Sequence, residues 1–337
     1  MEKETTSKIV LADIAADAAC SVAAVSLVLN PRPDRDSRIS PRTRERILAS
    51  ARKLGYRPNR TAEFLKRGYI PEIGVLLPNF GTNLVLELIK GCCRAAKEAA
   101  FSLSFNFDES ADELDGFLAE ATARRNCALL VYPGRPGWKS EESFKKYCAS
   151  GGKIAFVEPQ GPAMLCPLPK QPRLFLDDEY GGRLVADHLL AQGCRSFIIY
   201  GDDRTRVRTF IEELEKRGCR YKHFPMMAAP TAVVQEIRTL GENAGIFCVV
   251  DMLALKLHTA LLREGIVPGK DVRLCGYDCL FPTDRLIPRL TSVFQPFREL
   301  GYRGIKLLID QIYDHPVENL TFRPELRPFE STLGFGG

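Results

Sequence analysis

The chain has 337 residues, 45% of them hydrophobic, and a formal net charge of +5. This is the composition of a globular protein that is long enough for two or three domains. No apolar run approaches the roughly 20 residues that a membrane-spanning helix needs, so the composition excludes a membrane protein. No signal peptide pattern is present, and we therefore expect a cytoplasmic location.

The positive charge is concentrated near the N-terminus. Residues 1–68 contain 14 Lys and Arg against 8 Asp and Glu, a net charge of +6, whereas the rest of the chain has a net charge of −1. Such a basic segment attracts phosphate groups. The alternative is a basic solvated tail, which the helical pattern of the same segment disfavours.

The cysteines and histidines do not form a metal-ligand pattern. Eleven cysteines give an odd count and no CxxC pair, which favours reduced thiols, and the four histidines are scattered. Neither GxGxxG after the first strand, nor GxxxxGK[ST], nor GxSxG occurs, so nucleotide cofactors and catalytic triads lack support. We expect no metal, no cofactor and no enzymatic activity.

Residues 9–30 predict two short helices separated by a tight turn at residues 19–21. In the first helix the apolar residues recur at the spacing of one helical face, namely Leu11, Ile14, Ala15 and Ala18. Ser21 has a side-chain oxygen that can cap the second helix, and Val25, Val28 and Leu29 can pack back onto the first. A compact helix-turn-helix of this kind usually places its second helix in the DNA major groove.

A third helix is predicted after Ser40-Pro41, a capping residue followed by proline at the first helical position. Its apolar residues would face inward and its arginines outward, and Gly55 ends it. Residues 60–67 are helical in composition but too short to be stable alone.

From residue 71 onward, strand and helix patterns alternate. The expected strands are 73–77, 103–107, 128–132, 154–157, 173–176, 197–200, 245–250 and 272–276, and the expected helices between them are 83–100, 111–125, 140–149, 180–192, 205–217, 231–240 and 252–264. Such alternation predicts parallel sheets covered on both faces, and the number of units exceeds one sheet. The predicted fold is therefore an all-α helix-turn-helix head followed by two doubly wound parallel α/β lobes. Binding sites in such lobes lie at the carboxyl ends of the strands.

Short motifs follow one another in a fixed order along almost the whole chain. They are Asp13-Ile-Ala, Val25–Asn30, Ser40–Ile47 and Gly55–Asn59 in the first segment, and Leu176-Asp-Asp, Arg206–Phe210, Phe247–Asp251, Gly276-Tyr-Asp278, Leu290–Pro296 and Glu330-Ser-Thr332 in the second. In this order they resemble the LacI-type (lactose-repressor) family of bacterial transcription regulators. The resemblance implies a homodimer on a near-palindromic operator of double-stranded DNA, and an effector held between two lobes like those of periplasmic binding proteins.

The same resemblance implies the domain boundaries. Residues 1–58 would be the helix-turn-helix head, 59–69 a hinge helix and linker that orders on DNA, and 70–337 the effector-binding domain. One lobe would comprise about 70–160 and 296–322, and the other about 173–294 and 323–337, so that the chain crosses between lobes three times.

DNA-binding residues are carried over from the family pattern. Ser26, Asn30, Thr43, Tyr56 and Asn59 match positions on or near the phosphate backbone, although each can equally form a local cap or turn. Ser21, the expected cap of the second helix, is a further DNA-binding candidate. Leu65 matches a leucine that the family inserts into the minor groove, or it packs as an ordinary helix residue, and Glu63 beside it is unexpected near phosphate.

The base-reading positions are unusual, because Val22, Ala23 and Leu27 are all apolar. They can contact thymine methyl groups but cannot form hydrogen bonds with base edges. Val10 stands where the family has a threonine cap, a change that costs about 1 kcal/mol. We expect phosphate attraction, helped by Arg32, Arg35 and Arg38 in the loop, and a specificity that is reduced or biased to thymine.

The effector site is predicted around Arg206 and Asp251, which match ligand-binding positions of the family. Arg206 can grip hydroxyls, a carboxylate or a purine edge, and Asp251 can accept hydroxyl hydrogen bonds or simply cap a helix. Asp278 is expected to hold a turn. Further candidates at strand ends and at a lobe crossing, each with a packing or surface alternative, are Asn79, Phe80, Asn83, Tyr132, Arg135, Trp138, Glu158 and Gln295.

These residues predict a sequence-specific DNA-binding regulator, a repressor, under the control of a small-molecule effector. Polar groups of both signs and an aromatic residue favour a carbohydrate over a nucleobase. The alternative is a cytosolic sugar or nucleobase sensor whose head has lost operator recognition, which the apolar reading helix favours. An enzyme on the same lobes lacks a nucleophile–base pair, and an extracellular binding protein lacks a signal peptide.

Overall fold

The structure, a computed structural model, describes residues 9–29, 39–56, 70–78, 83–108, 111–124, 126–132, 141–158, 170–202, 204–241, 243–280 and 282–334. The chain divides into two compact units, residues 1–68 and residues 69–337. The predicted hinge at residues 59–69 lies entirely outside the described residues.

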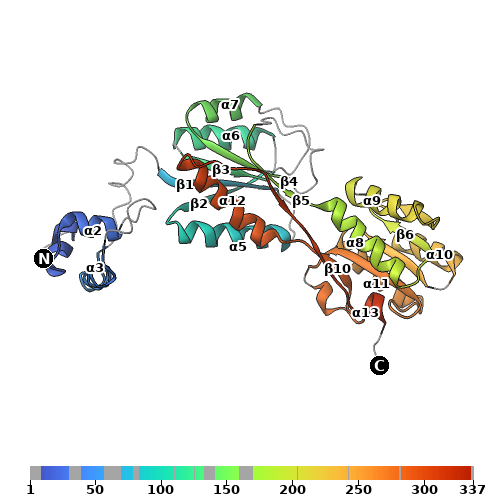
Figure 1. The fold of residues 1–337 in the computed structure, drawn as a ribbon. Coiled ribbons are helices and arrows are strands. Elements are labelled where there is room, and N and C mark those ends of the chain that lie inside the picture. The colour runs from blue at the N-terminus through green and yellow to red at the C-terminus, as the bar shows by residue number, and fades with distance from the viewer. Residues whose placement is uncertain are drawn as a thin grey trace, which may run out of the picture. The chain divides into compact units, whose positions relative to one another are not determined.

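The described part of the N-terminal unit contains three helices, α1 (Leu11–Asp17), α2 (Val22–Leu29) and α3 (Pro41–Lys53), drawn in blue in Figure 1. α1 and α2 meet at an angle of 109°, within the range of a helix-turn-helix. Ile14, Val25 and Ile47, one from each helix, are fully buried and form the centre of a small core. The predicted inward faces of the three helices are therefore confirmed.

Two of the three helices are capped by serine. The Ser21 Oγ accepts a hydrogen bond from the Ala24 amide at 3.1 Å, and the Ser40 Oγ accepts one from the Thr43 amide at 3.2 Å. At α1, Val10 offers no side-chain acceptor, and only the Asp13 carboxylate caps this end, accepting the Val10 amide at 2.8 Å. α1 is thus the least well capped helix of the described unit.

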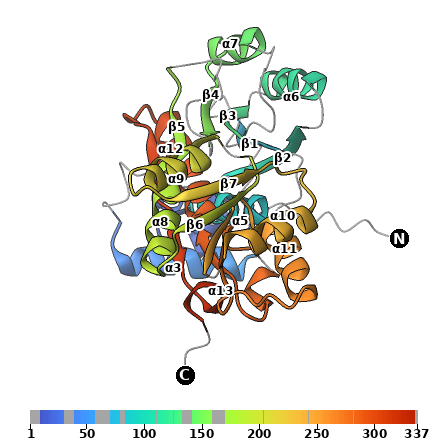
Figure 2. The same cartoon turned by 90° about the vertical axis from the view of Figure 1, so that its right-hand side faces the viewer.

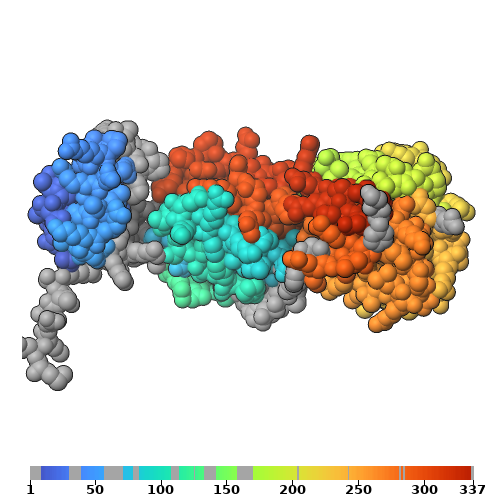
Figure 3. Space-filling model, turned by 90° about the horizontal axis from the view of Figure 1, so that it is seen from below, coloured from blue at the N-terminus to red at the C-terminus, as the bar shows by residue number. Residues whose placement is uncertain are grey.

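The first sheet of the second unit has the strand order β11-β5-β4-β3-β1-β2, and all its neighbouring strands are parallel. Its strands are β1 (Ile70–Pro78), β2 (Ser102–Asp108), β3 (Asn126–Val131), β4 (Lys153–Glu158), β5 (Arg173–Leu176) and β11 (Leu320–Phe322). One face is covered by α6 (Ala111–Ala123) and α7 (Glu141–Ala149), and the other by α5 (Asn83–Glu98) and α12 (Phe297–Ile312) (Figure 1). In the space-filling view the red α12 lies against the teal α5 (Figure 3).

Alternate residues of the central strands explain the two helical layers. Val75 and Leu130 belong to the core under α5 and α12, whereas their neighbours Leu76 and Leu129 belong to the core under α6 and α7. A strand buried on both faces has no polar side, and the six residues of β3 are all buried.

The second sheet has the order β12-β10-β9-β8-β6-β7. Its strands are β6 (Ser196–Tyr200), β7 (Arg220–Phe224), β8 (Ala244–Cys248), β9 (Val272–Asp278), β10 (Thr291–Phe294) and β12 (Glu325–Arg327), the last antiparallel to β10. Figure 2 shows α8 (Asp178–Ala191) and α9 (Arg204–Glu215) on one side of β6 and β7, and α10 (Pro230–Leu240) and α11 (Asp251–Arg263) on the other. The turn η3 (Thr283–Arg285) and α13 (Glu330–Leu333) complete this part.

The predicted fold class, a helical head and two parallel α/β lobes, is confirmed. The assignment of residues 173–176 to the second lobe is wrong, because β5 pairs with β4 and β11 in the first sheet. The chain passes between the sheets after β5, after β10 and after β11, three times in all. Of the described helices, none is by itself long and apolar enough to cross a membrane, although the bent pair α1–α2 reaches that length and apolarity in sum.

We expect Val10→Thr to stabilise the N-terminal unit by about 1 kcal/mol, because threonine supplies the acceptor that this helix start lacks. Val10 is 51% exposed, so the change removes little buried apolar surface. Hydrogen exchange of the α1 amides in the full-length protein measures the effect as slower exchange. Val10→Ala is the control that adds no acceptor, and equal exchange in the two variants would contradict the prediction.

Candidate DNA-binding face and effector site

The outward side of the predicted recognition helix is uncharged. Ser21, Val22 and Ala23 are exposed at the start of α2, and Ser26 and Leu27 are half-buried one turn later. Val25 and Val28, on the opposite side, are buried in the small core. α2 thus presents its first turn to solvent, which is the part of a recognition helix that contacts base edges.

The remaining predicted DNA contacts are only partly described. The Thr43 hydroxyl lies 2.9 Å from the Ser40 hydroxyl, so it forms part of the cap of α3, and Tyr56 packs half-buried against the core of the head. Asn30, Asn59 and Leu65 lie outside the described residues, as do the loop arginines 32, 35 and 38.

A buried polar network surrounds Arg206, the first predicted effector residue. Its guanidinium donates from Nε to the Asp178 carboxylate at 3.0 Å and from Nη1 to the Val249 carbonyl at 3.1 Å. It also stacks on the Tyr277 ring at 3.8 Å from the ring centre, while the Tyr277 hydroxyl donates to the same Asp178 oxygen at 3.1 Å. With 7% exposure for Arg206 and 2% for Asp178, this is a buried ion pair.

Gln295 extends the network to a second carboxyl group. Its Oε1 accepts a hydrogen bond from Arg206 Nη2 at 3.3 Å, and its Nε2 donates to Asp278 Oδ1 at 2.5 Å. Burial raises the pKa of the Asp278 carboxyl to about 8, against the opposing influence of the Arg206 charge, and the nearby Asp251 raises it further. Asp278 is therefore mostly protonated at neutral pH, which lets the buried site hold it without a second cation.

Asp251, the second predicted effector residue, is buried and hydrogen-bonded to neighbouring segments of the protein. Its carboxylate accepts hydrogen bonds from the Leu280 amide at 2.8 Å, the Thr283 hydroxyl at 2.9 Å and the Ser292 hydroxyl at 2.7 Å. Burial raises its pKa to about 6, although these hydrogen bonds favour the ionised form. The described contacts of Asp251 thus fasten the segment after β9 to the start of α11.

The other predicted effector residues scatter more widely. Tyr132 follows β3, is 5% exposed and packs against Phe297 with ring centres 6.1 Å apart. Asn83 is exposed at the start of α5, and Glu158 ends β4 with a side chain that is not described. Asn79, Phe80, Arg135 and Trp138 lie outside the described residues.

The sequence did not predict Asp178 and Tyr277 as site residues, and it predicted only a turn at Asp278. The signal was partly visible, because Asp278 ends β9 and Asp178 begins α8 just after β5. Gln295 likewise directly follows β10, whereas Arg206 lies in the first turn of α9. Asp278 does adopt a turn conformation, with φ of 117°, but its carboxyl is also buried in the network. The structure brings Arg206 and Gln295 together near the carboxyl ends of β5, β6, β9 and β10. Their partners there are Asp178, Tyr277 and Asp278.

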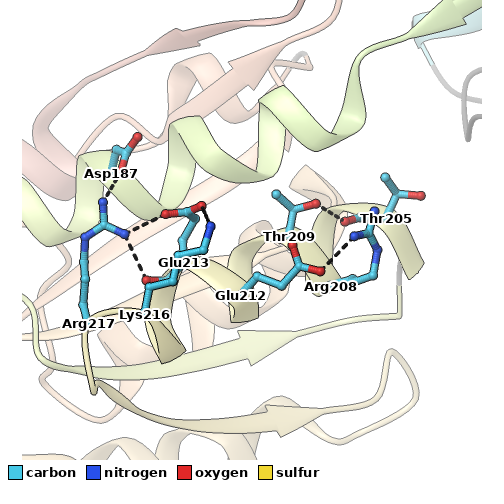
Figure 4. Close-up of polar contacts among 8 residues, drawn as sticks. All are labelled: Asp187, Thr205, Arg208, Thr209, Glu212, Glu213, Lys216 and Arg217. Carbon is cyan, nitrogen blue, oxygen red and sulfur yellow. Dashed lines mark hydrogen bonds and ion pairs between the residues drawn. The ribbon is translucent and has the colours of Figure 1, made fainter.

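Helices α8 and α9 hold Asp178 and Arg206 at pairing distance. On the outer side, Arg208 donates to Glu179 at 2.6 Å and Arg217 to Asp187 at 3.1 Å, and Figure 4 shows the second of these pairs together with the ion pairs along α9. A side chain at Gly182 would come within 2.7 Å of the Arg206 backbone oxygen, so the close approach of the two helices requires glycine there. The exposed pairs add little energy each, but they join the helices near both ends.

The network contains both donors and acceptors of hydrogen bonds, which here bond to one another. It contains a guanidinium, a primary amide, a phenol and carboxyl groups, and no arrangement of nucleophile and base. A cavity of about 300 Å³ between α12 and β11 includes none of the predicted residues. Within the described ranges, no three His, Cys, Asp or Glu side chains lie close enough to hold a metal ion.

Comparison with known proteins matches both units. Residues 10–59 match the model of bacterial regulatory proteins of the lacI family, and residues 186–332 match a periplasmic binding protein-like domain. The ribose operon repressor of Halalkalibacterium halodurans is 25% identical over 93% of both chains. The HTH-type transcriptional repressor PurR of Mannheimia succiniciproducens is 24% identical over 93% of this chain and 96% of its own.

Solved structures share the fold. The lac repressor dimer bound to operator and the anti-inducer ONPF superposes with a TM-score of 0.68 at 20% identity, covering 97% of this chain and all of that one. The complex of the regulator CelR with cellobiose gives 0.64 at 22% identity, covering 96% and 99%. The matched models and the likeness over almost the full length agree: the chain has a lacI-type DNA-binding head at residues 10–59 and a periplasmic binding protein-like domain at residues 186–332.

Proposed function

We propose that the protein is a sequence-specific DNA-binding transcriptional repressor whose operator affinity is controlled by a small molecule bound at the Arg206 network. One observation carries the proposal: a three-helix head with an outward α2 is joined to two lobes that gather polar groups at their strand ends. Ligand binding would shift the population between two lobe arrangements and so change the affinity of the head for DNA.

The effector that this site fits is a carbohydrate. Gln295 and Asp278 can accept hydrogen bonds from hydroxyl groups and donate hydrogen bonds to them. Arg206 can donate to two hydroxyl groups at once. Relatives named for ribose and cellobiose support a sugar, and the likeness to PurR keeps a nucleobase as the second candidate. Catalysis is not part of the proposal, since the network lacks a nucleophile and its base.

A homodimer on a near-palindromic operator fits the remaining surface. Met252 and Leu262 on α11 and Ile287 after η3 are large apolar side chains with 49%, 41% and 78% exposure. Exposed apolar residues of this kind favour a protein interface, and a two-fold dimer would place two heads on two half-sites. Such a regulator works in the bacterial cytoplasm, on the nucleoid.

The alternative of a sensor without operator recognition is favoured by one observation, the uncharged α2. Selection of duplexes from a random pool by the full-length protein separates the two. We expect a near-palindromic sequence whose affinity falls steeply with salt, because phosphate contacts release counterions. A sensor would select no sequence, and a chain lacking residues 1–68 is the control for binding through the head.

A thermal-shift screen of sugars and nucleobases identifies the effector. The proposal expects a stabilising sugar that also changes the affinity for the selected duplex. A sugar that stabilises the protein without changing its DNA affinity would contradict the control mechanism.

We expect Arg206→Met to destabilise the second unit by about 3–5 kcal/mol, because it leaves the Asp178 carboxylate buried without its cation. Urea denaturation of the purified protein measures the loss. Arg208→Met, two residues along α9, is the matched control: Arg208 pairs with exposed Glu179 and Glu212, and its loss costs about 1 kcal/mol or less. Equal losses in the two variants would contradict a buried pair.

The raised pKa of the Asp278 carboxyl predicts that the stability of the protein depends on pH. In the folded protein its pKa is raised to about 8, against about 4 in an unfolded chain, so the folded state binds more protons between these values. Stability therefore falls as the pH rises through this window, and Asp251, with a pKa of about 6, adds to the fall only in its lower part.

Asp278→Asn mimics the protonated side chain and keeps an acceptor for Gln295. The stability of this variant should therefore fall less between pH 6 and pH 8 than that of the original protein. Urea denaturation at several pH values measures the slope. Asp314→Asn changes an exposed aspartate and should keep the original slope. A slope unaltered by Asp278→Asn would show that this carboxyl is ionised in the folded protein.

A further inference from the structure

The outer face of α2, defined here as Val22, Ala23, Ser26 and Leu27, has no group that can form a bidentate hydrogen bond. The helix contains no charged and no amide side chain along its whole length. Val22 is 47% exposed, and Ala23 is also exposed, whereas Leu27 is half-buried. The single polar group of this face is the Ser26 hydroxyl.

Charge in the described part of the head lies on other elements. Arg42 and Arg52 are on α3, and Arg46, also on α3, donates from Nη2 to the Ala19 carbonyl at 3.2 Å. Lys53 is paired with Asp17 of α1 at 2.6 Å. Phosphate attraction from α3 positions a head on DNA without reading its sequence. Base readout by α2 is therefore left to apolar contact and to the Ser26 hydroxyl.

In the major groove, apolar contact distinguishes only one base. Thymine presents a C5 methyl group, whereas guanine, cytosine and adenine present hydrogen-bonding groups. An apolar side chain against a G·C pair leaves those groups desolvated and without partners, which is unfavourable. Valine or leucine against thymine instead buries one apolar group on another.

We propose that the outer face of α2 reads thymine methyl groups, so that the operator half-site is rich in A·T pairs where α2 enters the major groove. This inference rests on the DNA-binding function proposed above. Burial of one methyl group corresponds to about four-fold in affinity, and that is the contribution of each contacted thymine.

Replacing thymine by deoxyuridine tests this directly, since deoxyuridine keeps the pairing and the O4 acceptor and lacks only the methyl group. Duplexes are first selected by the full-length protein, and each thymine of the selected half-site is then replaced in turn. We expect A·T-rich half-sites and a loss of about four-fold at the contacted positions. A half-site specific for guanine, or deoxyuridine without effect at every position, would overturn the proposal.

Two variants assign the effect to α2. Val22→Ala removes two methyl groups from an exposed position and should abolish the deoxyuridine effect at the thymine that Val22 contacts. Leu48→Ala truncates a 39% exposed apolar residue on α3 and should leave the deoxyuridine profile unchanged. Circular dichroism melting confirms that both variants are folded.

The two proposals fail in different ways. If the protein selects no duplex at all, the DNA-binding function is overturned. If it selects a palindrome but Val22→Ala keeps the full deoxyuridine profile, readout by α2 methyl contacts is wrong while the regulator remains.

Discussion

The buried Arg206–Asp178 pair constrains several elements of the second unit at once. A guanidinium with 7% exposure requires a compensating charge and a partner for each donor. Here the partners come from four separated places in the chain: Asp178 at the start of α8, Val249 after β8, Tyr277 in β9 and Gln295 after β10. Satisfying one side chain therefore fixes the relative positions of four strand ends.

The pair also explains why small residues occur where α8 approaches its neighbours. A Cβ at Gly181 would lie 2.0 Å from the Tyr277 hydroxyl, and one at Gly182 would lie 2.7 Å from the Arg206 backbone oxygen. Larger residues would push α8 away from β9 and α9 and open the salt bridge. The charged network thus determines the packing, and a ligand that draws on Arg206 or Gln295 acts on the contacts that hold these elements together.

The number of carboxyl groups limits what this site can accept. Asp178, Asp251 and Asp278 are all buried, and Arg206 is the cation among them. With Asp278 protonated, Arg206 neutralises Asp178, and the ionised Asp251 leaves the four groups with a net charge of −1. The network offers both donors and acceptors, which suits hydroxyl groups. Among the described residues, an anionic ligand would meet Asp251 and Asp178 without a second buried cation, which favours a neutral sugar over a sugar acid or phosphate as the proposed effector.

The parts of this structure that depend on the local hydrophobic pattern could be predicted from the sequence. The inward residues of the head and the alternation of the two lobes follow from periodicity, and Arg206 and Gln295 followed from the resemblance. Asp178 and Tyr277 were missed because their contacts join positions 28 and 99 residues apart, which depends on which elements become neighbours. Strand β7 was missed because Arg220, Lys222 and His223 make it a polar edge strand, exposed along most of its length.

Because α2 is uncharged, sequence specificity would depend on the proposed dimer more than on a single head. A methyl contact contributes about 0.8 kcal/mol, whereas a bidentate hydrogen-bond pair contributes about 1–3 kcal/mol per base. One head of this kind discriminates weakly, but two heads held by a dimer add their free energies, so the discrimination ratio is squared. Weak readout by each head therefore makes operator choice depend strongly on whether both heads are correctly spaced. Because that spacing is what an effector-driven change in the lobes would alter, a small shift can control binding here more completely than it would for heads that each bind tightly alone.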